Sequence, residues 1–156
     1  MIIDLCCGIG RFPGEDVVSI DFDRKVKPTI VADIRHLPLR PRLRPRLCHA
    51  SPPCTYFSYA RARKYSYDEK GIADSLRLVA ACFDAFDYLE AQTWTLENPV
   101  GVLSRILPSD VKVHYAAADY KHKATVFYCN RRALKRALIP IDIRQKILDV
   151  AKEKHT

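Results

Sequence analysis

"MIIDLCCGIG", residues 1–10, begins the sequence with an apolar run that ends in a turn containing two glycines. Residues 1–6 are predicted to form a buried β-strand, with Asp4 near its end. Gly8 and Gly10 follow in the turn, where glycine allows the backbone to approach a ligand closely at the carboxyl edge of a sheet. The stretch therefore predicts the first strand and the ligand-binding turn of an α/β fold. An ordinary strand-to-helix turn would show the same glycines.

Alternating apolar runs and polar turns continue along the chain. We expect further strands at residues 17–22, 28–33, 46–51, 93–98, 111–118 and 124–130. Helical spacing of apolar residues predicts a helix over 71–91, and shorter helices are expected after Pro99 and over 139–154. The short link "DYKHK" between the last two strands favours an antiparallel hairpin. The predicted fold class is α/β, with a Rossmann-like, mostly parallel sheet that ends in this hairpin.

The size and charge of the chain limit its function. Its 156 residues suit a single domain spanning 1–156. No apolar run reaches the ~18 residues that cross a bilayer, and the first residues do not resemble a signal segment. We therefore expect a soluble, cytoplasmic protein with no membrane partner. The net charge of +8 favours a polyanionic partner.

Basic residues gather in three parts of the sequence. The clusters are Arg40, Arg42, Arg44 and Arg46; Arg61, Arg63 and Lys64; and Arg131, Arg132, Lys135 and Arg136. Aromatic residues interleave with the second cluster, and cations beside stacking faces are typical of nucleic-acid grooves. A solvated basic surface is the alternative. The first cluster alternates with proline and leucine, and the stretch 38–46 is interpreted as a flexible insert.

The six cysteines lack the spacing of a zinc site or a disulfide framework, so no metal is expected and most should be buried apolar residues. Cys54 differs from the others because it follows two prolines in "HASPPCTYFSYAR", residues 49–61. Pro52 and Pro53 remove two amide donors and restrict the backbone, which would hold the thiol in place. Nearby cations would raise its thiolate fraction. We interpret Cys54 as a nucleophile rather than a buried filler.

Acidic residues stand at the ends of successive predicted strands. After Asp4, Asp21 ends the second strand, where it can bind the two hydroxyls of a ribose, and Asp33 ends the third, where it can accept from an exocyclic amine. Phe22 and Ile34 follow these acids and could enclose an adenine. The glycine loop lacks the full GxGxxG pattern of a dinucleotide site. Acids around this loop suit a cationic cofactor without phosphates, and S-adenosyl-L-methionine fits.

These motifs resemble a known family. "DLCCGIG", "SIDFD", "ADI", "SPPCTYFS", "LENP" and "YKHKAT" occur in the order and roughly the spacing of the DNA (cytosine-5) methyltransferases, and most resemble the compact phage-type members. The resemblance extends from Asp4 to about Leu148. Its specific part is the Pro-Pro-Cys segment with Phe57 and Ser58 and a Glu-Asn pair downstream. It implies an S-adenosylmethionine-dependent methyltransferase sheet that methylates carbon 5 of cytosine in DNA.

The resemblance also implies roles for individual residues. Cys54 would add to ring carbon 6 of cytosine, and Glu97 would hold ring nitrogen 3 and the amino group. Cofactor-binding positions are Asp4, Cys7, Gly8, Gly10, Asp21, Phe22, Asp33 and Ile34. Substrate or nucleic-acid contacts are Pro53, Asn98, Arg61, Arg63, Lys121 and Lys123. The two lysines depart from the familiar glutamine-arginine-arginine set, so phosphate contact is the alternative for them.

A larger departure concerns target recognition. Classical members carry a separate recognition domain where this chain has only "NRRALKRALI", residues 130–139. Sequence specificity is therefore expected to be poor, short, or supplied by a homodimer or a second subunit. Two other functions stay open. "SPPC" also resembles the segments of amino-directed (adenine N6 or cytosine N4) DNA methyltransferases, and a non-catalytic nucleic-acid-binding protein could keep the same fold. RNA is an alternative substrate.

Overall fold

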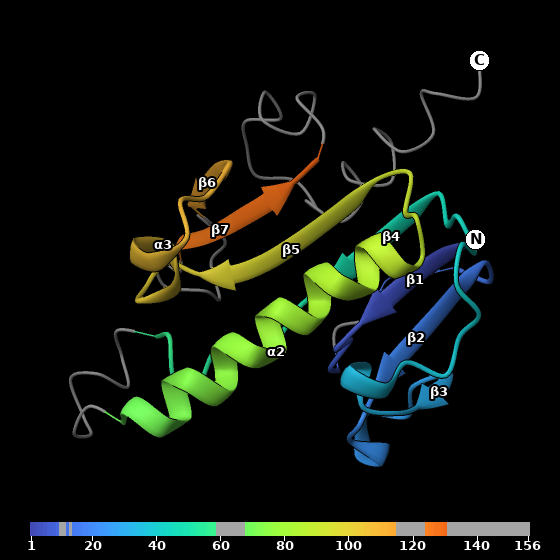
Figure 1. The fold of residues 1–156 in the computed structure, drawn as a ribbon, viewed down its shortest axis with the longest axis horizontal. Helices are drawn as coiled ribbons and strands as arrows, with labels where there is room; N and C mark the ends of the chain where they lie inside the picture. Colours follow the sequence, from blue (N-terminus) through green and yellow to red (C-terminus); the bar gives the residue numbers. More distant parts are fainter. Residues whose placement is uncertain (10–11, 13, 59–67, 115–123, 131–156) are drawn as a thin grey trace.

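A computed structural model describes residues 1–9, 12, 14–58, 68–114 and 124–130. Within these residues, seven strands form one sheet in the order β3-β2-β1-β4-β5-β7-β6 (Figure 1). The strands are β1 (Ile2–Leu5), β2 (Val17–Asp21), β3 (Ile30–Val31), β4 (Leu47–Ala50), β5 (Trp94–Pro99), β6 (Val111–His114) and β7 (Ala124–Cys129). The first five run parallel, whereas β7 runs antiparallel to both β5 and β6. The predicted α/β class and the antiparallel hairpin are confirmed.

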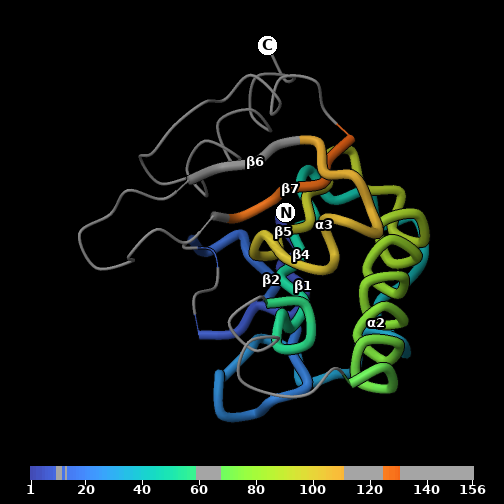
Figure 2. The backbone as a smooth tube through the Cα atoms, turned by 90° about the vertical axis from the view of Figure 1, so that its left-hand side faces the viewer, coloured from blue at the N-terminus to red at the C-terminus, as the bar shows by residue number. Residues whose placement is uncertain are grey.

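Helix α2 (Glu69–Tyr88) corresponds to the long predicted helix and lies across one face of the sheet. Figure 2 shows it standing on one side of the strands when the sheet is turned by 90°. Its start is fixed by Asp68, whose side chain accepts from the Gly71 amide at 2.8 Å. The short helix expected after Pro99 is α3 (Leu103–Ile106). The helix expected over 139–154 lies outside the described residues.

Two 3₁₀ turns, η1 (Arg24–Val26) and η2 (Ile34–His36), were not predicted. Each begins after an aspartate, because Asp23 and Asp33 accept from the backbone amides two residues ahead. They follow the ends of β2 and β3 and turn the chain away from the sheet. The predicted strand over 28–33 is correspondingly short, since Asp33 already caps η2.

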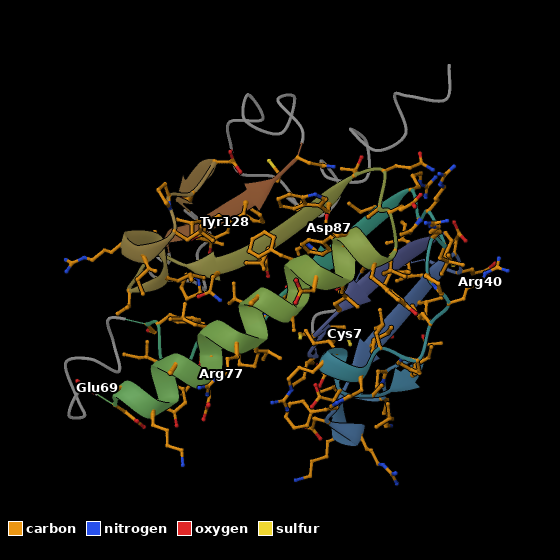
Figure 3. All side chains as sticks on the ribbon, viewed as in Figure 1. Cys7, Arg40, Glu69, Arg77, Asp87 and Tyr128 are labelled. Atoms are coloured by element: carbon orange, nitrogen blue, oxygen red, sulfur yellow. The ribbon has the colours of Figure 1, made fainter. Side chains whose placement is uncertain are left out.

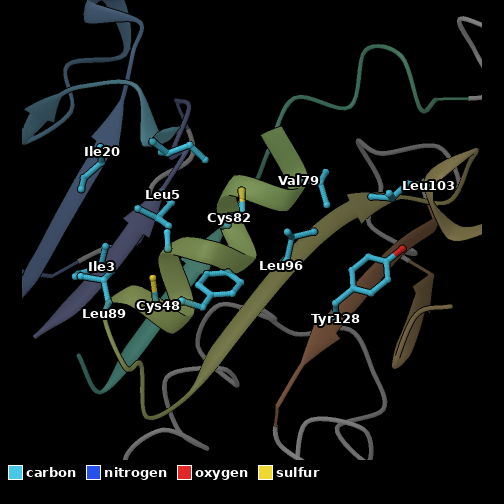
Figure 4. Close-up of a cluster of buried hydrophobic side chains, with 14 of the residues drawn as sticks. Ile3, Leu5, Ile20, Cys48, Val79, Cys82, Leu89, Leu96, Leu103 and Tyr128 are labelled. Carbon is cyan, nitrogen blue, oxygen red and sulfur yellow. The ribbon is translucent and has the colours of Figure 1, made fainter. Parts of the chain in front are cut away.

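The main core fills the space between α2 and the sheet (Figure 4). Buried apolar side chains of the strands, which include Ile3, Leu5, Ile20 and Leu96, form one cluster with Val79 and Phe86 of α2 and with Leu89, which follows the helix. The Phe86 ring stacks on Trp94 with centroids 5.1 Å apart. Cys48 and Cys82 belong to this core, as predicted. Burial of large apolar surfaces of this kind is the main source of stability.

The stretch 38–46 is anchored to the rest of the protein, so its interpretation as a flexible insert was wrong. The amides of Arg42 and Arg44 donate to the carbonyls of Tyr88 and Leu89 at the end of α2, at 2.9 and 2.8 Å. The stretch leads into the first residue of β4 and therefore lies at the amino edge of the parallel strands. Figure 3 labels Arg40 beside this end of α2, far from Glu69 at its start. The first basic cluster is thus opposite to the edge where the strands end.

Candidate active site at the carboxyl edge of the sheet

The glycine loop after β1 is held by two of the predicted acids. Gly8 has a left-handed φ of 54°, and its amide donates to Asp21 Oδ2 at 3.0 Å. The second oxygen of Asp21 accepts from the Asp23 amide at 2.9 Å. Each carboxylate oxygen can accept more than one hydrogen bond, so Asp21 keeps capacity for a ligand hydroxyl. Asp21 is therefore both a support of the loop and a candidate contact.

Asp4 and Cys7 are almost fully buried, with 2% and 3% of their surfaces exposed. The Asp4 carboxylate accepts from the Phe12 amide at 2.9 Å, which ties the far side of the loop to β1. These positions support the loop from inside the protein, and direct contact of either side chain with a cofactor stays a prediction. Gly10 lies outside the described residues.

A cavity of about 340 Å³ opens at the ends of β1, β2 and β3. This volume is within the range of small-molecule sites. The cavity brings together predicted positions from four segments of the chain: Gly8, Asp21, Phe22, Asp33, Ile34 and Pro53. Phe22 has 70% of its surface exposed whereas Ile34 is buried, so one wall is an accessible aromatic ring and the other is fixed in the core. Cys6, Arg35, Ser51 and Leu78 also line it, and sequence reasoning did not identify them.

Asp33 is held in its charged form by Arg35. The guanidinium Nε donates to both carboxylate oxygens, at 2.9 and 3.0 Å, and the Arg35 amide donates to Oδ1 at 3.0 Å. These bonds lower the pKa of Asp33 to about 2. Asp33 therefore stays a hydrogen-bond acceptor for a ligand amine throughout the physiological pH range.

The Cys54 segment forms a tight turn directly after β4. The amides of Phe57 and Ser58 both donate to the Cys54 carbonyl oxygen at 3.0 Å. The Cys54 side chain is half-buried, in contrast to the fully buried thiol of Cys48, whose pKa is raised by burial. A thiol in the core cannot meet a substrate, whereas Cys54, in the loop after β4, is partly exposed and directly follows Pro53, which lines the cavity.

The loop after β5 is joined to the Cys54 segment. Asn98 is buried, and its Nδ2 donates to the Pro52 carbonyl oxygen at 3.1 Å. The Val102 amide donates to the Phe57 carbonyl oxygen at 2.8 Å. A Cβ atom at Gly101 would overlap that same oxygen, so only glycine permits this approach. Asn98 thus shapes the two loops, and its predicted contact with substrate stays a prediction.

Glu97 lies at the same edge as Cys54, because it follows Leu96, the residue of β5 that pairs with Ala50 at the end of the parallel strand β4. Its Oε1 accepts from the Ser51 hydroxyl at 3.0 Å, and Ser51 lies three residues before Cys54. The predicted nucleic-acid contacts Arg61, Arg63, Lys121 and Lys123 lie outside the described residues. Nothing in the structure therefore tests these four positions.

No known family model matches this chain, and no curated protein matches it. In the described ranges, no helix combines the length and apolar character needed to cross a membrane. Among those same residues, histidine, cysteine and acidic side chains do not gather in a group of three or more that could hold a metal ion. Function is therefore inferred from the residues and geometry of the chain itself.

Proposed function

We propose that the protein is an S-adenosyl-L-methionine-dependent DNA (cytosine-5) methyltransferase that uses Cys54 as its nucleophile. The observation that supports this most is that Pro53 lines the cavity containing Asp21 and Asp33, and Cys54 is the next residue along the chain. A methyl donor in the cavity would then lie beside a thiol that can activate a base. Glu97, tied to Ser51 of the same segment, supplies the carboxylate that this chemistry needs.

The cavity suits the proposed cofactor. It offers two carboxylates, Asp21 and Asp33, for the ribose hydroxyls and the adenine amine, and Phe22 and Ile34 for the two faces of the adenine ring. S-adenosyl-L-methionine supplies an electrophilic methyl group when bound. Arg35 also lines the cavity, but its guanidinium is already paired with Asp33. Residues 6–9 would orient the cofactor toward the Cys54 segment, because both follow neighbouring parallel strands.

The proposed reaction begins at the thiol. The Cys54 thiolate forms a bond to carbon 6 of a cytosine turned out of the stack, which makes carbon 5 nucleophilic. In its protonated form, Glu97 would donate its proton to ring nitrogen 3 and accept from the amino group, which neutralises the negative charge that thiolate addition places on the ring. Carbon 5 would take the methyl group as the bond between that methyl and the sulfonium sulfur breaks, which leaves a neutral thioether. Water would then take the proton from carbon 5, the ring double bond would form again as the bond between carbon 6 and sulfur breaks, and ring nitrogen 3 would return its proton to Glu97. The thiolate of Cys54 is then free again.

The test uses DNA that contains 5-fluorocytosine, because fluorine at carbon 5 cannot leave as a proton does. With cofactor present, we expect a covalent adduct that survives denaturation. Cys54→Ser should form no adduct and should lose methyl transfer by at least about 10³-fold, since a serine hydroxyl is scarcely ionised near neutral pH. Cofactor affinity, measured by calorimetry, should not change.

The matched control is Cys129→Ala, which removes a buried thiol from β7 and should still form the adduct. An amino-directed methyltransferase would give no adduct and an active Cys54→Ser variant. A non-catalytic binding protein would transfer no methyl group at all. RNA of the same sequence, tested beside the DNA, decides which polymer is the substrate.

A further inference from the structure

We propose that His49 and Ser51 are positioning residues that hold the Glu97 carboxylate through a hydrogen-bonded chain across β4 and β5. The effect on catalysis rests on the function proposed above, whereas the chain itself rests on geometry. Two of its members, Thr95 and Glu97, are alternate residues of β5; the other two are His49 of β4 and Ser51, the first residue after β4. Their side chains lie on the face opposite α2, because Cys48, Ala50 and Leu96 between them pack into the core beneath that helix.

The contacts form an unbroken series. His49 Nδ1 lies 2.7 Å from Thr95 Oγ1, and its Nε2 lies 2.9 Å from Ser51 Oγ. The Ser51 hydroxyl donates to Glu97 Oε1 at 3.0 Å. His49 and Thr95 are each only 1% exposed, so water cannot readily replace their partners. The hydrogen-bonded chain therefore begins at the buried Thr95 and His49 and ends at the half-buried Glu97.

Counting protons fixes the direction of every bond. With Glu97 ionised, as it is before it meets a base, the single hydrogen of the Ser51 hydroxyl is donated to the carboxylate, which can only accept. Ser51 Oγ must therefore accept from His49, so Nε2 carries the proton. In a neutral ring, Nδ1 then accepts from the Thr95 hydroxyl. The structure thus assigns one tautomer to His49.

The hydrogen-bonded chain is also supported by residues of the glycine loop and of β1. The Phe12 ring meets the His49 ring edge-on, with centroids 4.9 Å apart, and the Phe12 amide is bonded to Asp4. Asp4 is the register partner of His49 on β1. Ser51 itself lines the cavity. The same buried group of side chains therefore supports the glycine loop and aims Glu97.

This arrangement explains how a half-buried glutamate can act on a base. A free glutamate side chain samples many rotamers, and a catalytic group must be held close to its productive geometry. The Ser51 hydroxyl restricts the Glu97 carboxylate, and His49 restricts Ser51. Loss of the hydroxyl should slow the step in which Glu97 acts, addition of Cys54 to carbon 6, with little effect on cofactor binding.

The kinetic test is Ser51→Ala. We expect the rate of adduct formation on 5-fluorocytosine DNA and kcat to fall roughly ten- to a hundredfold, with KM and cofactor affinity changed by less than about threefold. Ser51→Thr keeps a hydroxyl and should recover most of the rate. Ser75→Ala, the same change on α2, is the control and should match the wild type. A Ser51→Ala variant as fast as the wild type would overturn the positioning role while leaving the proposed function intact.

The structural test needs no activity. Nitrogen-15 spectra of histidine side chains, with His49→Gln to assign the signal, should place a slowly exchanging proton on His49 Nε2. In Ser51→Ala that proton should exchange faster, because its acceptor is gone. A proton found only on Nδ1, or exchange unchanged in Ser51→Ala, contradicts the chain. If the wild type forms no adduct on fluorinated DNA, the proposed function fails, and these spectra still decide whether Glu97 is held in this way.

Discussion

The two edges of the sheet use similar residues for different purposes. At the carboxyl edge, Asp21 is buried and Ser51 is half-buried, and both line a cavity. At the amino edge, Arg42 and Arg44 both pair with Glu90, and the two arginine side chains are 79% and 70% exposed. Exposed pairs of this kind contribute little stability, whereas buried polar contacts depend strongly on each partner. Burial, rather than charge, distinguishes the candidate site.

This difference also changes the interpretation of the basic clusters. The cluster at 40–46 favoured a nucleic-acid groove by its composition, but the structure places it at the far end of β4 from Cys54. Arginines of this cluster also have acidic partners: Arg42 and Arg44 pair with Glu90, and Arg46 Nη2 lies 3.9 Å from Asp16 Oδ2. A base presented to Cys54 would therefore approach over the opposite edge. The other two clusters lie outside the described residues.

After Cys54→Ser, the largest effect is expected for Glu97→Gln at the carboxyl edge. The amide keeps the size of the side chain but cannot give a proton to ring nitrogen 3 as a carboxyl group can. Methyl transfer should fall by about 10²- to 10³-fold, with cofactor affinity and melting temperature close to wild type. Single-turnover transfer from labelled cofactor measures the loss. Full activity in this variant would remove Glu97 from the site.

Gly101→Ala should be the most damaging change to stability. The new Cβ would overlap the Phe57 carbonyl oxygen, which is backbone and cannot rotate away. We expect a loss of about 2–3 kcal/mol in the free energy of unfolding, measured in urea. Gly71→Ala is the comparison, because its new Cβ meets the Tyr56 ring, a side chain that can move. Equal losses in the two variants would show that the loops after β4 and β5 are not tightly joined.

A smaller effect is expected for Asp21→Ala. The change removes the acceptor of the Gly8 and Asp23 amides as well as the proposed ribose contact. Cofactor affinity should weaken by about tenfold, equivalent to roughly 1.4 kcal/mol. Calorimetric titration measures it. An unchanged dissociation constant would exclude Asp21 as a cofactor contact.

The smallest effect is expected at the amino edge. Glu90→Gln removes the shared partner of Arg42 and Arg44, and the free energy of unfolding should fall by only about 0.5 kcal/mol. The loss should shrink further in high salt. Methyl transfer should match the wild type. If transfer fell instead, the two edges would have to be coupled through β4 and α2, and the contrast between them would no longer hold.

The strands were predictable because apolar runs with polar ends identify them. The order of the strands in the sheet was not predictable, since the placement of β7 between β5 and β6 depends on pairing over long sequence separations. The 3₁₀ turns after Asp23 and Asp33 depend on local side-chain capping, which an apolar pattern does not report. The anchored stretch 38–46 was missed because composition does not show that its amides meet the carbonyls at the end of α2.

At the site, acids at strand ends could be predicted to converge, because parallel strands end at one edge. The place of Arg35 at this edge could not be predicted, since nothing in the sequence shows that its side chain turns back onto Asp33. The chain from Thr95 to Glu97 had a signal that sequence reasoning overlooked. Polar residues at alternate positions of two buried strands, such as His49 and Ser51, must find partners on the same face.

The contacts that join the loops after β4 and β5 have a consequence for evolution and for engineering. Asn98 of β5 donates to the Pro52 carbonyl oxygen in the loop after β4, and Gly101 in the loop after β5 lies against the Phe57 backbone, so a change of shape in one loop should disturb the other. Substitutions in one should be strongly epistatic with substitutions in the other. In a chimera that takes residues 51–58 from a different protein, these residues would not fit the loop after β5. Residues 97–102 of that protein would have to be transferred as well. The two segments, 51–58 and 97–102, are far apart in the sequence, and we expect them to be replaced together.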